Sequence, residues 1–257
     1  MSGSVLGMAL PAEVSGLRLL VGAPLALAAG YVHGLTGLGF AIVFTPLFVL
    51  VVPNPHDVVF LALLLGTVLC AVVLIEARGR HRVRHGGPLL VGAFVGTPVG
   101  VFVLTQIAAG ALTIVIAVTA IVVATGWMLR LPPPIRRERP AVAAAALLGG
   151  FLNGSTSMGG PPPALLASLQ RWPVQESRLA MATFNLASYA VAIVVGISAG
   201  AADLGFLTLG LLLLPAAVAG NLAGSWSARR ISTAGFRYVL IGVVWLAGAT
   251  SLLTTLT

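Results

Sequence analysis

Two glycine-rich segments place polar side chains inside otherwise apolar sequence. The first break, residues 30–40, carries His33 and Thr36, and the second break, residues 150–160, carries Asn153 and three hydroxyl side chains. In hydrocarbon such a break frees backbone N–H and C=O groups, which is tolerated only where protein or a water-filled cavity surrounds them. Two breaks at corresponding places in two halves of a chain are the pattern that marks a transporter's binding site.

The two breaks repeat one another at a fixed separation. A shift of 120 residues places Gly30 on Gly150, His33 on Asn153, Gly34 on Gly154, Thr36 on Thr156, Gly39 on Gly159 and Pro53 on Pro173. The sequence therefore predicts a single transmembrane domain over residues 1–257, built from repeats at 17–129 and 141–257. A linker rich in arginine and proline, residues 130–140, joins the two repeats.

The composition is that of an integral membrane protein. Of the 257 residues, 58% are hydrophobic and 8% are charged, and the mean hydropathy is +1.07. A soluble domain has about 25% charged residues. The net charge of +8 comes from arginines in short loops between apolar stretches. These arginines are better interpreted as topology signals than as a nucleic-acid surface, so we expect a lipid bilayer and no nucleic acid as partner.

Helices and loops follow from the apolar stretches and their interruptions. In the first half, two short helices should meet at the first break between Arg18 and Val52, as a re-entrant hairpin or a pair of short crossings. We expect residues 53–57 to form a loop, because two prolines disrupt a helix interior. Three helices should follow, at about 58–75, 88–105 and 109–129.

The second half predicts the same order of elements. A broken segment over 141–170 should precede helices at about 178–198, 203–226 and 236–256. The predicted fold class is therefore an all-α polytopic membrane protein. Each repeat would contain one broken or re-entrant segment and three full transmembrane helices.

The arginine distribution indicates how the halves are related. If each broken segment returns to its starting face, the second half lies upside down, and 13 of the 14 arginines fall on one face. A parallel arrangement divides them nine to five. The positive-inside rule therefore favours an inverted-topology repeat with the arginine-rich loops in the cytoplasm.

The breaks are suited to an anion. A helix that begins inside the membrane directs free N–H groups and the positive end of its dipole toward the midplane. Hydroxyl, amide and imidazole side chains add donors. The candidate substrate-binding residues are His33, Gly34, Thr36, Gly37, Gly39, Asn153, Gly154, Ser155, Thr156, Gly159 and Asn185.

Simpler structural roles compete with this interpretation. Glycines can serve close helix packing, which we assign to Gly96 with Gly100 and to Gly220 with Gly224. His33 could be a satisfied core histidine or the one ionisable group near a break. Asn185 could line the path or bond a neighbouring helix.

For two further side chains a structural role is the favoured interpretation. Arg178 is expected to extend to the cytoplasmic face. The single cysteine, Cys70, allows neither a disulfide nor a cysteine metal site within one chain. We expect no metal and no cofactor.

The order of these features resembles the TauE/SafE family. The residues that carry the resemblance are the broken start with Gly34-Leu35-Thr36-Gly37-Leu38-Gly39, the basic loop after the next helix, and the second break running into Pro161-Pro162-Pro163. The resemblance covers essentially the whole chain. It implies a multi-pass protein of the bacterial plasma membrane that exports sulfite, sulfonates or related sulfur anions.

Other function classes can be compared with this one. The chain has no lysine and no Gly-x-x-x-x-Gly-Lys-[Ser/Thr], which excludes a P-loop nucleotide motor. It also has no array of paired acids or activated nucleophile, so we do not expect an enzyme. A passive anion channel and a transporter of a small carboxylate stay as alternatives. Coupling could use His33, sodium at freed carbonyls, or no ion, and the sequence does not indicate an oligomeric state.

Overall fold

The computed structural model describes residues 16–52, 54–77, 83, 85–128, 135–200 and 205–228, with the single positions 245, 248, 249 and 253. Throughout these residues the regular structure is α-helical. The helices are α1 Gly16–Thr36, α2 Phe40–Phe48, α3 Pro55–Ala77, α4 Gly86–Gln106, α5 Ala109–Met128, α6 Glu138–Thr156, α7 Pro161–Leu169, α8 Val174–Ser198 and α9 Gly205–Ser227.

Six of the helices in the described ranges are long and apolar enough to cross a bilayer. They are α1, α3, α4, α5, α8 and α9. The protein is therefore an all-α polytopic membrane protein, which confirms the predicted fold class. The helix expected near 236–256 lies outside the described residues, and the inverted relation of the halves stays a prediction.

The broken segments differ from the expected pair of short helices. In the first half α1 has 21 residues and α2 has nine, and in the second half α6 has 19 and α7 has nine. Only the second helix of each pair is short. Glycines that lower helix propensity, such as Gly30 and Gly34, lie inside α1, because packing against a neighbouring helix outweighs propensity.

The start of α3 is a second correction. We expected a loop as far as Asp57, but the helix begins at Pro55. Proline is tolerated in the first turn, where its missing N–H would have no partner within the helix. The N–H of His56 donates to Oδ1 of Asn54 at 3.2 Å, so Asn54 caps the helix.

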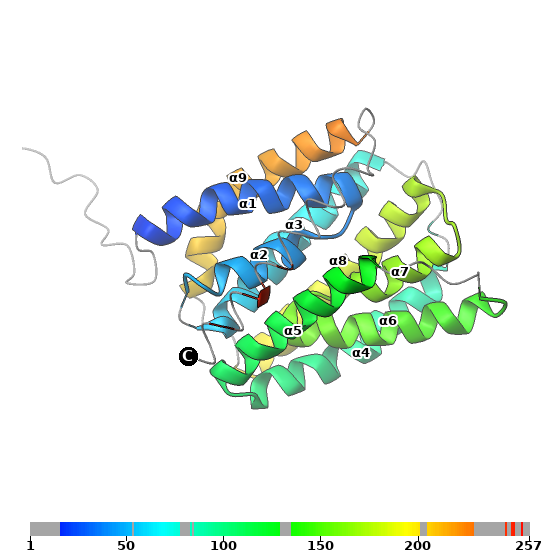
Figure 1. Ribbon diagram of the computed structural model, residues 1–257, viewed down its shortest axis with the longest axis horizontal. Coiled ribbons are helices and arrows are strands. Elements are labelled where there is room, and N and C mark those ends of the chain that lie inside the picture. Colours follow the sequence, from blue (N-terminus) through cyan, green and yellow to red (C-terminus); the bar gives the residue numbers. More distant parts are fainter. Residues whose placement is uncertain are drawn as a thin grey trace, which may run out of the picture.

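The long helices form two flanking pairs with a third pair between them. In Figure 1, α1 lies along α9 on one flank, and α4 lies along α6 on the other. Between them α3 and α8 run antiparallel, since Gly66 contacts the ring of Tyr189 and Gly196 contacts the ring of Phe60. This central pair separates the two flanks.

Glycines set the close approach of α1 and α9. A Cβ at Gly220 would lie 2.0 Å from the carbonyl oxygen of Leu27, and one at Gly224 would lie 2.1 Å from that of Tyr31. Neither distance leaves room for a side chain. The packing role assigned to these two glycines is confirmed.

The other flank repeats this contact. A Cβ at Gly96 would lie 2.3 Å from the carbonyl oxygen of Leu147, and one at Gly100 would lie 2.1 Å from that of Phe151. Leu147 and Phe151 of α6 stand 120 positions after the residues of α1 that the glycines of α9 contact. The pair α4–α6 therefore reproduces the pair α9–α1 residue by residue.

Candidate functional site

The first break is a three-residue turn between α1 and α2. Gly37 has φ 74° and Gly39 has φ 111°, conformations that favour glycine. The N–H of Gly37 donates to the carbonyl of His33 at 2.7 Å and so closes the last turn of α1. The backbone conformation alone therefore favours glycine at both positions.

The second break begins with the same turn. Ser157 follows α6 and has φ 63°, in the position that Gly37 occupies after α1. The N–H of Ser157 donates to the carbonyl of Asn153 at 3.0 Å. The two breaks therefore share their local geometry although the residue at the turn differs.

The two threonines end their helices in the same way. Thr36 Oγ1 donates to the carbonyl of Val32 and Thr156 Oγ1 donates to that of Leu152, both at 2.8 Å. Each hydroxyl also accepts an N–H from two residues ahead, at 3.3 Å in the first break and 3.4 Å in the second. The hydroxyl hydrogens are thus engaged within the breaks. Thr36 is exposed, whereas Thr156 is buried.

The structure brings the two breaks into contact. A Cβ at Gly160 would lie 3.3 Å from Cβ of Leu38. Farther along, the hydroxyl of Thr45 in α2 lies 2.9 Å from that of Ser157. The second break therefore runs beside α2, and the polar groups of both halves share one buried region.

Asn153 is the centre of a hydrogen-bonded network in the second break. Its Nδ2 donates to Oδ1 of Asn185 on α8 at 3.0 Å, and its Oδ1 accepts the N–H of Gly159 at 2.5 Å. Of the two roles considered for Asn185, bonding to a neighbouring helix is the one observed. A Cβ at Gly159 would lie 1.8 Å from the carbonyl oxygen of Gly149, so only glycine fits there.

Ser155 faces its own helix. Its Oγ donates to the carbonyl of Phe151 at 2.8 Å, and the residue is buried. This bond is local to α6.

Gly34 and Gly154 require a correction. We expected the backbone at both positions to be open to a ligand. Instead, a Cβ at Gly34 would lie 2.0 Å from the carbonyl oxygen of Asn221 in α9, and one at Gly154 would lie 2.2 Å from that of Thr97 in α4. A neighbouring helix occupies the space, and close packing explains both glycines.

His33 is fully buried on α1. Its Nε2 lies 3.7 Å from Sγ of Cys70 on α3. Its Nδ1 has no hydrogen-bond partner in the described part of the chain. The imidazole is therefore a core histidine whose Nδ1 has no partner among the described residues.

Arg178 does not extend to the surface as expected. The residue is buried at the start of α8, and its side chain lies against Gly37 of the first break. Its Nη2 donates to Oγ of Ser225 on α9 at 2.5 Å and lies 3.4 Å from a carboxylate oxygen of Glu76 on α3. Arg178 thus joins three helices behind the first break.

A metal site is not found in the described residues, where no three His, Cys, Asp or Glu side chains gather. The polar region contains amides, hydroxyls, one imidazole and backbone N–H groups. These groups can form hydrogen bonds with a small polar or anionic molecule.

A family model described as sulfite exporter TauE/SafE matches residues 21–251, nearly the whole chain. The chain belongs to the TauE/SafE family. Members of this family are transporters, and the six apolar helices fit a multi-pass TauE/SafE membrane protein. Neither a curated protein nor a solved structure matches the chain.

Asn221, Thr97 and Ser188 of the TauE/SafE chain were missed at the sequence level. All three are buried, and the hydroxyls of Thr97 on α4 and Ser188 on α8 lie 2.6 Å apart. Asn221 follows Gly220 as Thr97 follows Gly96. The duplication could have identified this pair, because each stands directly after a packing glycine.

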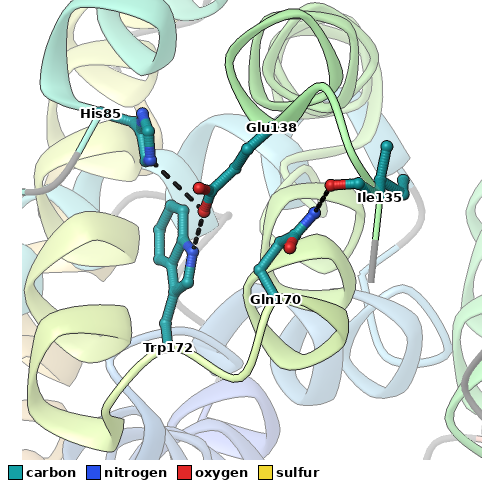
Figure 2. A network of polar contacts seen from close by, with 5 residues as sticks. All are labelled: His85, Ile135, Glu138, Gln170 and Trp172. Carbon is teal, nitrogen blue, oxygen red and sulfur yellow. Dashed lines mark hydrogen bonds and ion pairs between the residues drawn. The ribbon is translucent and has the colours of Figure 1, made fainter. Parts of the chain in front are cut away.

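A second polar network fastens one end of the TauE/SafE chain (Figure 2). His85 before α4 and Trp172 before α8 both reach Glu138 at the start of α6. Trp172 Nε1 donates to Oε1 of Glu138 at 2.6 Å, and His85 Nε2 lies 3.3 Å from the same oxygen. Nearby, Gln170 Nε2 donates to the carbonyl of Ile135 at 3.0 Å. These bonds hold helix ends together outside the polar region of the breaks.

Proposed function

We propose that this TauE/SafE protein is a secondary transporter that carries a small sulfur-containing anion, such as sulfite or a sulfonate, out of a bacterial cell across its plasma membrane. The observation that carries the proposal is the contact between the two breaks, Leu38 against Gly160 and Thr45 against Ser157. Paired helix breaks that meet are where transporters of duplicated design bind substrate. The family description supplies the substrate class.

The proposed substrate site uses neutral donors. Backbone N–H groups of the breaks, the imidazole of His33 and the amides of Asn153 and Asn185 surround it, and Thr36 and Thr156 hold the helix ends in place. Arg178 lies nearby but is paired with Glu76. Neutral donors suit an anion that must also leave, because an unpaired buried charge would bind it strongly.

The repeat is proposed to be inverted, and the helix directions support this. Gly22 contacts Leu213 and Gly34 contacts Asn221, so α1 and α9 run parallel. The contacts between α4 and α6 show that these two helices also run parallel. If each helix from α1 to α9 runs opposite to the helix before it, α1 is parallel to α9 and α4 is parallel to α6, as observed. In that arrangement α6 runs opposite to α1. In Figure 1, α1 starts at the left of the molecule and α6 at the right.

Transport kinetics in liposomes test the function. We expect purified protein to exchange labelled sulfite for internal unlabelled sulfite with saturable counterflow. A sulfonate should compete, because it is a similar anion. Dimethyl sulfone, which is uncharged and of similar size, should not compete.

Three results would contradict the proposal in different ways. Sulfite flux without saturation or counterflow would indicate a passive channel. Equal inhibition by dimethyl sulfone would remove the argument for an anion site. Preferred exchange of a small carboxylate over sulfite and sulfonates would identify a carboxylate transporter.

A further inference from the structure

The repeat relates two pairs of buried polar positions, and in one of them every side chain is paired. Asn153 bonds Asn185 and Gly159, and Thr97 bonds Ser188. These contacts lie on α6, α4 and α8. In this pair the protein itself therefore supplies a partner for each side chain.

The equivalent pair leaves three polar atoms without a hydrogen-bond partner in the described part of the chain. Asn153 corresponds to His33 on α1, and Thr97 corresponds to Asn221 on α9. Both are fully buried. Within the described part of the chain, Nδ1 of His33 and both Nδ2 and Oδ1 of Asn221 have no hydrogen-bond partner. The carbonyl of Asn221 lies against Gly34, so the two residues stand at the same level of the α1–α9 contact.

Leaving these three atoms unpaired is unfavourable. Buried polar groups in folded proteins nearly always have partners, and a buried amide without them bears its full desolvation cost. In the α4–α6 pair the equivalent side chains have hydrogen-bond partners within the protein. The fold can therefore supply such partners at these positions. The α1–α9 pair therefore presents buried donors and acceptors that a molecule outside the chain can satisfy.

The chemistry of Asn221 specifies that molecule more closely than an anion site in general does. An amide offers N–H donors on Nδ2 and an acceptor on Oδ1. A fully ionised oxyanion only accepts hydrogen bonds, so it would leave Oδ1 unpaired. An oxyanion that keeps one O–H can accept from Nδ2 and donate to Oδ1. Its single charge also costs less to bury than two.

We propose that Asn221, with His33, forms a site beside the contact of α1 and α9 that selects the singly protonated form of an oxyanion substrate. The proposal rests on the function above, whose substrate class it narrows to anions that carry an O–H group. Oδ1 of Asn221 accepts a hydrogen bond from the O–H group of the substrate, and His33 Nδ1 contributes a further hydrogen bond.

Two competitors of nearly the same size and shape test this selection. At mildly acidic pH, methylphosphonate carries one charge and one O–H, whereas methanesulfonate carries one charge and no O–H. In wild-type liposomes methylphosphonate should inhibit sulfite counterflow roughly tenfold more effectively, about the value of one hydrogen bond to a charged group. In Asn221→Leu, which is similar in size and has no polar atoms, the preference should disappear.

Thr97→Val is the matched control, because Thr97 occupies the equivalent position but is already paired. It should keep the preference for methylphosphonate. The melting temperature of the protein in detergent gives a readout that does not depend on transport. Methylphosphonate should raise it more than methanesulfonate does in wild type and in Thr97→Val, but not in Asn221→Leu.

The outcomes separate this inference from the proposed function. If wild-type protein transports sulfite but responds equally to both competitors, or if Asn221→Leu keeps the preference, the inference is wrong and the function stands. The inference is also wrong, and the function stands, if Asn221→Leu changes only the melting temperature, as expected when the amide holds a structural water. If wild-type protein moves no sulfur anion, the function fails, and the melting-temperature comparison still decides the inference.

Discussion

At the scale of single residues, the hydroxyls of the breaks terminate helices. Thr36 and Thr156 donate to carbonyls four residues back and accept N–H groups two residues ahead. A hydroxyl has one hydrogen to donate. Once that hydrogen is used within the helix, the side chain positions the break, and we expect other groups to bind the ligand.

This role predicts a loss of stability at Thr156 without a loss of affinity. Thr156→Val keeps the shape but removes both hydrogen bonds, and should lower the free energy of unfolding by about 1 kcal/mol. Thr156→Ser keeps the hydroxyl and should resemble wild type. Thermal unfolding in detergent and the half-saturation concentration for sulfite are the measurements. A tenfold weaker affinity with unchanged stability would show that the hydroxyl contacts the substrate.

At the scale of elements, two glycine-lined helix contacts organise the bundle. The glycines of α9 meet carbonyls of α1, and the glycines of α4 meet the equivalent carbonyls of α6. Helices in lipid gain little from burying apolar surface against one another, so close packing of small residues carries much of their association. These contacts also bring Asn221 and Thr97 to their positions beside the two breaks.

A methyl group at the contact should therefore disrupt it. Gly96→Ala would place a Cβ 2.3 Å from the Leu147 carbonyl oxygen and should lower stability by about 1–3 kcal/mol. Gly87→Ala lies in the same helix, but nothing lies within 4 Å of its Cβ position, so it is the matched control. Yield of monodisperse protein and melting temperature report the difference. Equal behaviour of the two variants would contradict the packing assignment.

At the scale of the whole molecule, buried contacts join the two halves of the chain. Arg178 of α8 reaches Glu76 of α3, and Thr45 of α2 reaches Ser157 of the second break. Buried contacts therefore hold the two halves together, and the central pair in Figure 1 consists of α3 from the first half and α8 from the second. The proposed inverted repeat would place their equivalent ends on opposite faces of the membrane.

The inverted topology predicts which positions a membrane-impermeant thiol reagent can reach. In a Cys70→Ser background, single cysteines at Arg136 and Arg229 should react only from the cytoplasmic side, because they belong to the arginine-rich face. A cysteine at Asn54 should react only from outside. Labelling is measured on right-side-out and inside-out vesicles. Reaction at position 229 from outside would instead favour the parallel arrangement.

The sequence by itself determined the membrane class, the duplication and the positions of the two breaks. Each of these is a property of composition or of spacing along the chain, so no knowledge of neighbours in space is needed. The repeat of His33 in Asn153 and of Thr36 in Thr156 was visible for the same reason. Helix ends were close to those observed, except where α1 continues through Gly30 and Gly34 and where α3 begins at Pro55.

Only the tertiary structure decided what the individual polar residues and glycines do. The sequence does not show whether Gly34 faces a ligand or the carbonyl of Asn221. Nor does it show whether Arg178 lies at a surface or beside Glu76. Partners such as Asn185 for Asn153 come from helices that are distant along the chain. Thr97 and Asn221 are equivalent in the repeat, but Thr97 has the hydroxyl of Ser188 beside it, whereas the amide of Asn221 has no partner among the described residues. That difference exists only once the helices are packed.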